Sequence, residues 1–217
     1  MKGSRPLTDK EVERCLACFS GRFRARNRAL FLIGINTGFR VSELLSLRLG
    51  DVIEKDGKIT SEITVWKRNT KGKIESRSMF LNELSKKALA PWLQELEQRD
   101  IVHKDDFIFK SMRGARAITK ERAWVILHEV FEGGELKGKL GTHCMRKTFA
   151  IKIYLYNLSR VAAGEPVDAF RLTSKALGHQ DIKSTDQYLP FSKEDIEKAV
   201  MAICNLRLTN DDFRFKI

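Results

Sequence analysis

The sequence predicts an α+β domain that is mostly α-helical and carries one small antiparallel β-sheet. Apolar residues recur at helical spacing through most of the 217-residue chain. The pattern changes to the alternation typical of strands only between residues 59 and 81. We find no internal repeat, low-complexity tract or interdomain linker, so a single domain over residues 1–217 is the simplest arrangement.

Residues that favour helix ends place the helices. Thr8 and Glu11 have the spacing of a capping box, so a helix begins there. Gly38 suits the left-handed backbone that ends many helices, and Arg40 stands at the start of the short helix that follows. The predicted helices are residues 8–19, 22–36, 41–47, 85–98, 119–131, 142–157, 168–176 and 192–207.

The predicted sheet is a hairpin. Asp56 and Gly57 signal a turn, after which residues 59–66 alternate like a strand. Residues 76–81 are its expected partner, and residues 69–73 form the tip between them. Because so short a loop joins them, the two strands are expected to be antiparallel.

The chain is strongly basic, with 40 Lys and Arg against 28 Asp and Glu and a formal charge of +12. Such an excess implies a polyanionic partner, of which nucleic acid is the commonest. A basic peripheral membrane protein is the competing interpretation, but no apolar run approaches the roughly 18–20 residues of a membrane span. The first residues hold no apolar signal region, so we expect a cytoplasmic protein.

Four cysteines lie at positions 15, 18, 144 and 204. Cys15 and Cys18 form a C-x-x-C pair, but no second pair follows at the spacing of a zinc finger. Since the pair lies in a predicted helix, two buried thiols are favoured over a metal or redox site. We therefore expect no bound metal and a reducing compartment.

Short motifs along the chain combine into one candidate phosphoryl-transfer site. They are Thr37-Gly38-Phe39-Arg40-Val41-Ser42-Glu43, Thr142-His143-Cys144-Met145-Arg146, Leu177-Gly178-His179, and Tyr188, nine residues after His179. Each is weak alone, but in this order and spacing they resemble the catalytic domain of the tyrosine recombinases, the lambda-integrase family that includes Cre recombinase. The resemblance covers about residues 7–190 and implies a helical core flanked by a three-stranded sheet.

Arg40 and Arg146 are the expected phosphate-binding residues. Phosphoryl transfer places extra negative charge on the non-bridging oxygens, and without a metal that charge must be met by fixed cationic donors. Arginine suits this task because its planar fork donates two parallel hydrogen bonds and stays charged. Taken alone, Arg40 would more often pair with Glu43, three residues on. The downstream motifs reverse that preference.

Two histidines complete the expected proton-transfer and phosphate-binding groups. His143 and Arg146 lie three residues apart on a helix that Thr142 is expected to cap, so both project from one face. Taken alone, a His-x-x-Arg motif is more often a solvated helix end. In the same way, Gly178-His179 alone is more often the C-cap of a helix. The resemblance implies that His143 assists proton transfer at the tyrosine and that His179 hydrogen-bonds the scissile phosphate.

Tyr188 is the expected nucleophile. Tyr154 and Tyr156 fall in an apolar helical stretch, whereas Tyr188 lies in a polar segment nine residues after His179, as the resemblance requires. A free tyrosine has a pKa of about 10, so it needs help to attack near neutral pH. The neighbouring cations offer that help.

The resemblance implies that a lysine on the hairpin is the general acid for the leaving 5′ oxygen. Counting back from Met79-Phe80-Leu81, which stands where the family has Val-Pro-Leu, favours Lys71. The competing interpretation is that the hairpin lysines only contact backbone phosphates. Candidate DNA contacts, which would give salt-dependent affinity rather than sequence readout, are Lys67, Arg68, Lys73, Arg113, Arg116, Lys120 and Arg122.

The resemblance implies a site-specific DNA recombinase or integrase that cuts and rejoins DNA through a 3′-phosphotyrosyl intermediate without a cofactor. Its expected partners are double-stranded DNA and further copies of itself, from dimer to tetramer, in a bacterial or archaeal cell or as a phage or mobile-element product. A non-catalytic DNA-binding regulator of the same fold and a type IB topoisomerase-like enzyme are the alternatives.

The resemblance also divides the chain. It implies a core over residues 1–190 and a C-terminal helix and tail over residues 191–217, which packs on a neighbouring protomer or on its own core. Most members of the family carry a core-binding domain before the catalytic domain, and some carry an arm-binding domain before that. Because Met1 stands about where the catalytic domain would begin, we expect neither domain here, which is a departure from the family. A naturally minimal enzyme and a fragment both fit this arrangement.

Overall fold

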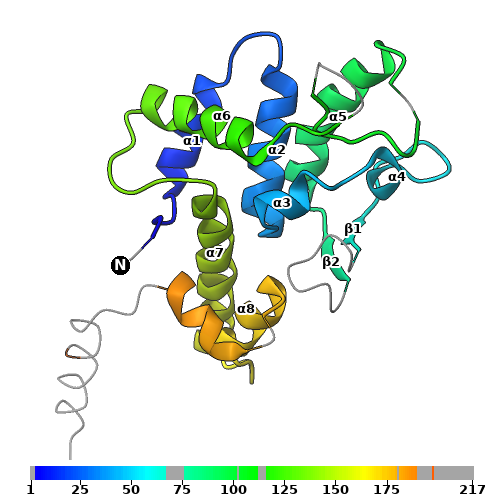
Figure 1. Ribbon diagram of the computed structural model, residues 1–217. Helices are drawn as coiled ribbons and strands as arrows, with labels where there is room; N and C mark the ends of the chain where they lie inside the picture. Colours follow the sequence, from blue (N-terminus) through cyan, green and yellow to red (C-terminus); the bar gives the residue numbers. More distant parts are fainter. Residues whose placement is uncertain are drawn as a thin grey trace, which may run out of the picture.

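The computed structural model describes residues 3–66, 76–101, 103–111, 116–179 and 181–189, together with residue 197. This part of the chain is mostly helical with a two-stranded antiparallel sheet at one edge (Figure 1), which confirms the predicted fold class. The elements are α1 (Asp9–Cys18), α2 (Arg24–Thr37), α3 (Val41–Leu44), α4 (Leu49–Val52), β1 (Glu62–Val65), β2 (Arg77–Phe80), α5 (Glu83–Glu97), α6 (Lys120–Gly133), α7 (His143–Ala162), α8 (Ala169–Leu177) and the 3-10 helix η2 (Ile182–Tyr188). The helix predicted over residues 192–207 lies outside the described residues, apart from residue 197.

Helix α2 is the centre of the helical core. It packs against both α5 and α7, and α6 packs against α1 (Figure 1). Because partners cover more than one of its faces, Leu30, Phe31 and Ile33 are all fully buried although they point in different directions. The carboxyl end of α2 is therefore held rigidly, and the segment with Arg40 follows directly from it.

The start of α1 shows the predicted capping box. The Thr8 hydroxyl accepts the Glu11 N–H at 3.3 Å, and the Glu11 carboxylate accepts the Thr8 N–H at 2.9 Å. Arg5 also binds this carboxylate and, through that hydrogen bond, lowers the pKa of Glu11 to about 2. The segment before α1 is thereby fastened to the core.

The prediction of one helix over residues 41–47 is wrong. The helix stops at Leu44, and α4 begins separately after Arg48. After Leu45 the hydrogen bonds tighten to three-residue spacing: the Ser46 N–H donates to the Glu43 carbonyl at 3.1 Å, and the Leu47 N–H donates to the Leu44 carbonyl at 3.2 Å. The Leu47 carbonyl then accepts the Ile108 N–H at 3.0 Å, so the chain does not run on into α4 as one helix.

The sheet is shorter than predicted. β1 and β2 pair antiparallel with Glu62 opposite Phe80 and Val65 opposite Arg77. Before β1, the Thr60 N–H donates to the carbonyl of Val52, the last residue of α4, at 2.9 Å. The backbone at Thr60 is therefore bonded to the end of α4 and not to the second strand of the hairpin. Among the described residues the sheet has two strands rather than the three that the resemblance implies, and residues 69–73 lie outside them.

The cysteine prediction is correct for Cys15 and wrong for Cys18. Cys15 is fully buried, and burial raises the pKa of its thiol to about 12. Cys18 is only partly buried, because it lies at the last turn of α1. Both thiols are free. No helix within the described ranges has the length and apolar character needed to cross a membrane.

Gly38 ends α2 in the left-handed conformation that the sequence predicts, with φ of 61° and its N–H bonded to the Gly34 carbonyl at 3.1 Å. A Cβ atom at Gly38 would lie 2.3 Å from the Phe149 ring. The position thus needs glycine twice, for its backbone angle and for the close approach of α7.

We expect Gly38→Ala to cost more stability than the matched change Gly57→Ala. Both glycines have positive φ, at 61° and 83°, so each alanine carries about 1–2 kcal/mol of backbone strain. Only the alanine at position 38 also meets an aromatic ring, whereas nothing lies within 4 Å at position 57. Chemical denaturation would measure the two losses in the free energy of unfolding, and equal losses would contradict the close contact with Phe149.

Candidate active site

Five of the predicted site residues come together where several helices end. Arg40 follows α2, His143 and Arg146 lie in the first turns of α7, His179 follows α8, and Tyr188 ends η2. α7 packs along α8, and η2 contacts both helices (Figure 1). The fold thus gathers residues from distant parts of the sequence at one edge of the core.

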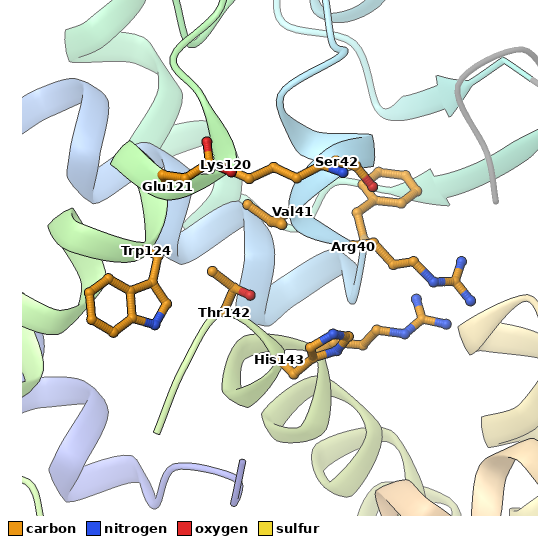
Figure 2. A pocket seen from close by; sticks show the side chains of 10 residues that line it. Arg40, Val41, Ser42, Lys120, Glu121, Trp124, Thr142 and His143 are labelled. Atoms are coloured by element: carbon orange, nitrogen blue, oxygen red, sulfur yellow. The ribbon is translucent and has the colours of Figure 1, made fainter. Parts of the chain in front are cut away.

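A cavity of about 490 Å³ opens beside Arg40 (Figure 2). Arg40, His143 and Arg146 line it, together with Lys120 and Trp124 from α6. Figure 2 shows the Lys120 side chain extending along the cavity toward the α3 side. Three cationic side chains therefore border one hollow, which suits an anionic ligand.

Thr142 stands at the N-cap of α7 but does not cap it as predicted. Its own backbone is helical, with φ of −57° and ψ of −28°, and its side chain makes no cap hydrogen bond. A capping residue normally has extended backbone that turns its hydroxyl toward the first N–H groups. His143 is exposed, and it lines the cavity with Arg146 as their spacing of three predicts.

Arg40 is paired with Glu43 and also borders the cavity. Its Nη1 lies 2.8 Å from Glu43 Oε1, and its backbone N–H donates to Glu43 Oε2 at 2.7 Å. The Glu43 carboxylate is 1% exposed, whereas the Arg40 side chain is 25% exposed. The ion pair therefore fixes the guanidinium in place and leaves part of it accessible from the cavity.

Arg146 is a buried cation held by backbone carbonyls. It donates to Gly38 O and, at 2.6 Å, to Leu177 O, which close the ends of α2 and α8. Its Nε has no hydrogen-bond partner among the described residues. Burial lowers the pKa of Arg146, and the Arg40 charge lowers it further. Since Arg146 also lines the cavity, its charge is close to any anion that enters there.

Arg77 is a member of this cluster that the sequence analysis missed. Its Nη2 donates to Thr37 O at 3.0 Å and to Ala176 O at 2.6 Å, and its Nη1 lies 3.4 Å from Glu43 Oε2. These partners are 40, 99 and 34 residues away along the chain. No local pattern on the strand could indicate them.

His179 connects the arginine cluster to η2. Its Nε2 is 3.1 Å from Arg146 Nη2, and its Nδ1 is 2.9 Å from the hydroxyl of Thr185. Because arginine can only donate, Nε2 accepts this bond, and the network assigns the ring proton to Nδ1. Burial, followed by the charges of Arg146, Arg40 and Arg77, lowers the pKa of His179 to about 4. His179 is therefore neutral at physiological pH and helps to orient Arg146.

Tyr188 packs against both His179 and Arg146. The ring centroids of His179 and Tyr188 are 5.0 Å apart, and Arg146 Cζ lies 5.4 Å from the Tyr188 ring centroid. Tyr188 is only 8% exposed, in a small apolar cluster with Phe149. In contrast, Tyr156 is 64% exposed on α7. The tyrosine with the family spacing is thus the one beside the cationic cluster.

The remaining predicted residues fall into two groups. Arg116 and Arg122 are exposed, and Arg122 lies 3.8 Å from Glu129 instead of lining the cavity as Lys120 does. The others lie outside the described residues, and they are Lys67, Arg68, Lys71, Lys73 and Arg113.

Comparison with known proteins gives a consistent result. A sequence model of the phage integrase family matches residues 5–195. The tyrosine recombinase XerC of Caldanaerobacter subterraneus is 27% identical over 194 residues, which cover 89% of this chain and 49% of that protein. The type 1 fimbriae regulatory protein FimE of Escherichia coli K12 is 28% identical over 191 residues, which cover 87% of this chain and 86% of FimE.

A solved structure of XerH site-specific recombinase, bound to palindromic difH substrate in a post-cleavage complex, superposes with a TM-score of 0.68 and 26% identity. The match covers 92% of this chain and 53% of that one. The chain thus spans about half the length of the Xer recombinases that it matches.

We expect the His179 ring to stay neutral between pH 7 and pH 5. Its pKa of about 4 lies below the usual value of 6.5, so the pH must fall to about 4 before half of the His179 rings are protonated. NMR titration of the histidine ring signals would test this, with His179→Gln identifying the signal. A His179 signal that titrates near pH 6.5 would contradict the buried, arginine-flanked environment.

Proposed function

We propose that this chain, which belongs to the phage integrase family, is the catalytic domain of a tyrosine-type site-specific DNA recombinase. The observation that carries the proposal is the packing of Tyr188 against His179 and Arg146, beside the cavity that Arg40 and His143 line. A phosphate in that cavity meets fixed cationic donors, and one of them, Arg146, also contacts the Tyr188 ring.

In the proposed reaction the Tyr188 hydroxyl attacks a phosphorus atom of the DNA backbone. The new bond is a 3′-phosphotyrosyl ester, and the bond from phosphorus to the 5′ oxygen breaks. The tyrosine proton passes to His143, and Lys71 supplies a proton to the leaving 5′ oxygen. Attack by the 5′ hydroxyl of another strand reverses these steps, so the energy of the phosphodiester is kept.

Arg40 and Arg146 are proposed to stabilise the charge that develops on the non-bridging oxygens. The accessible part of Arg40 and the part of Arg146 that lines the cavity are the groups offered to it. His179 holds the Arg146 guanidinium from the other side at 3.1 Å. The arginines are therefore oriented before the substrate arrives.

Double-stranded DNA is the proposed substrate. The chain carries a charge of +12, and Lys120 extends the cationic lining of the cavity onto α6. Arg116, Arg122 and the hairpin cations Lys67, Arg68 and Lys73 are proposed to contact backbone phosphates. Exchange of strands needs at least two cleaved duplexes, so we also propose an assembly of two to four copies on DNA.

We expect Tyr188→Phe to abolish covalent attachment to DNA. The probe is a pool of nicked duplexes with randomised sequence beside the nick, from which the short 5′-hydroxyl fragment diffuses away and traps the protein–DNA adduct. The variant keeps the buried ring but lacks the attacking oxygen, so it should fold normally and form no adduct. Tyr156→Phe, on the exposed face of α7, is the matched control and should react like the wild type.

Peptide mapping identifies the attached residue in the wild-type adduct. Attachment at Tyr154 or Tyr156, or an adduct formed by Tyr188→Phe, would overturn the assignment of the nucleophile.

We expect Lys71→Ala to cut DNA about 100-fold or more slowly, because a general acid contributes on that order. In a substrate with sulfur in place of the bridging 5′ oxygen, the leaving group is a thiolate, which departs without being protonated. This substrate should therefore restore the cleavage rate of Lys71→Ala. Lys67→Ala and Lys73→Ala are the controls. Rescue of either control in place of Lys71→Ala would mean that a different hairpin lysine is the acid.

A further inference from the structure

Arg77 reaches from the edge of the sheet into the centre of the site. Its side chain is only 10% exposed, and Cζ lies 4.8 Å above the Phe39 ring. Nη2 donates to the carbonyls of Thr37 and Ala176, while Nη1 lies 3.4 Å from both Gly38 O and Glu43 Oε2. One side chain therefore connects β2 to the ends of two helices and to a buried carboxylate.

Arg77 and Arg146 bind neighbouring carbonyls at the same two helix ends. At the end of α2 they bind Thr37 O and Gly38 O, and at the end of α8 they bind Ala176 O and Leu177 O. The last carbonyls of a helix lack partners within the helix and carry its negative dipole. The two arginines thus hold α2 and α8 at a fixed separation. The position of Arg146 therefore depends on the same two helix ends that Arg77 binds.

The link from Arg77 to Arg40 runs through Glu43. The Glu43 carboxylate binds Arg40 through Nη1 and through the backbone N–H, and its Oε2 also faces Arg77. Burial of this carboxylate requires that cations surround it, since a buried charge is costly when it is unpaired. Removing Arg77 takes away one of the two cations and frees the carboxylate to move with Arg40.

The packing around Arg77 allows little freedom. A Cβ atom at Gly178 would lie 2.8 Å from Arg77 Cδ, and the backbone there has φ of 63°. The stem of Arg77 therefore occupies space that only glycine leaves free, directly before His179. Close packing of this kind transmits the position of the guanidinium to the segment that carries His179.

We propose that Arg77 is a positioning residue of the phosphoryl-transfer site, acting through Glu43 on Arg40 and through the end of α8 on His179 and Arg146. This inference rests on the proposed function and adds a residue to it. The planar guanidinium is essential because it spans two carbonyls and a carboxylate at once, which an ammonium group cannot do.

The first test compares Arg77→Met and Arg77→Lys with the matched control Arg48→Met. Arg48 also stacks on a phenylalanine, with Cζ 4.4 Å from the Phe107 ring centroid. Its side chain donates to the Asp105 carbonyl, whereas Arg77 bonds to the ends of α2 and α8 and faces Glu43. Methionine keeps the apolar stem, and lysine keeps the charge. The probe is the nicked duplex recovered from the wild-type adduct, and the variants are compared at saturating DNA below their melting temperatures.

Both Arg77 variants should form the adduct at least about tenfold more slowly than the wild type, because a small displacement of catalytic groups is costly. Their affinity for the duplex should stay within about threefold, since phosphate contacts elsewhere hold the DNA. Arg48→Met should match the wild type in both. A folded Arg77→Met variant that forms the adduct at the wild-type rate would overturn the proposal. If Arg77→Lys formed the adduct at the wild-type rate, the charge of Arg77 alone would explain its effect, and the positioning role would be wrong.

A double-mutant cycle shows whether Arg77 acts through Arg40. If it does, Arg77→Met should slow Arg40→Ala much less than it slows the wild type. Equal slowing in both backgrounds would overturn the path through Glu43.

An NMR measurement without DNA separates this inference from the proposed function. Arg77→Met should shift the His179 ring signals, and Arg48→Met should not. Unchanged His179 signals would overturn the positioning of α8 even if the wild type cleaves DNA, whereas a wild type that forms no adduct would overturn the proposed function alone.

Discussion

The site depends on the meeting of two helix carboxyl ends. α2 and α8 both finish with a left-handed glycine, Gly38 and Gly178, and their last carbonyls point at the same two guanidinium groups. Each arginine satisfies carbonyls that have no partner within their helix. This one interaction closes the core, fixes the separation of the helices and orients Arg146. His179 and Tyr188 follow α8 in the chain, so their positions depend on where the end of α8 is held.

The same arrangement stores unfavourable charge. Within the described part of the site, Arg40 and Arg77 pair with one buried carboxylate, Glu43, and the charge of Arg146 acts on Arg77. Burial and the neighbouring arginines lower the pKa of Arg77 to about 9 and that of His179 to about 4, so both shifts favour loss of positive charge. A bound phosphate diester would supply the missing negative charge.

Much of the architecture follows from local sequence patterns. The capping box at Thr8 and the left-handed end of α2 at Gly38 were predicted, and both are present because each depends on a few consecutive residues. The helix over residues 41–47 and the length of the strands were predicted wrongly. In the helix, tighter bonds such as Leu47 N–H to the Leu44 carbonyl replace the α-helical ones, and before the strand the Thr60 N–H bonds to the Val52 carbonyl.

By itself, the sequence determined the fold class and the strongly basic character, because both follow from composition and local periodicity. The resemblance of its short motifs to a known family singled out the candidates Arg40, His143, Arg146, His179 and Tyr188. Only the tertiary structure decided that Arg77 belongs to the cluster and that burial and the neighbouring arginines lower the pKa of His179. The physical reason is distance along the chain. The carbonyls, the carboxylate and the burial that set these properties come from segments as far as 99 residues away, and no local pattern encodes them.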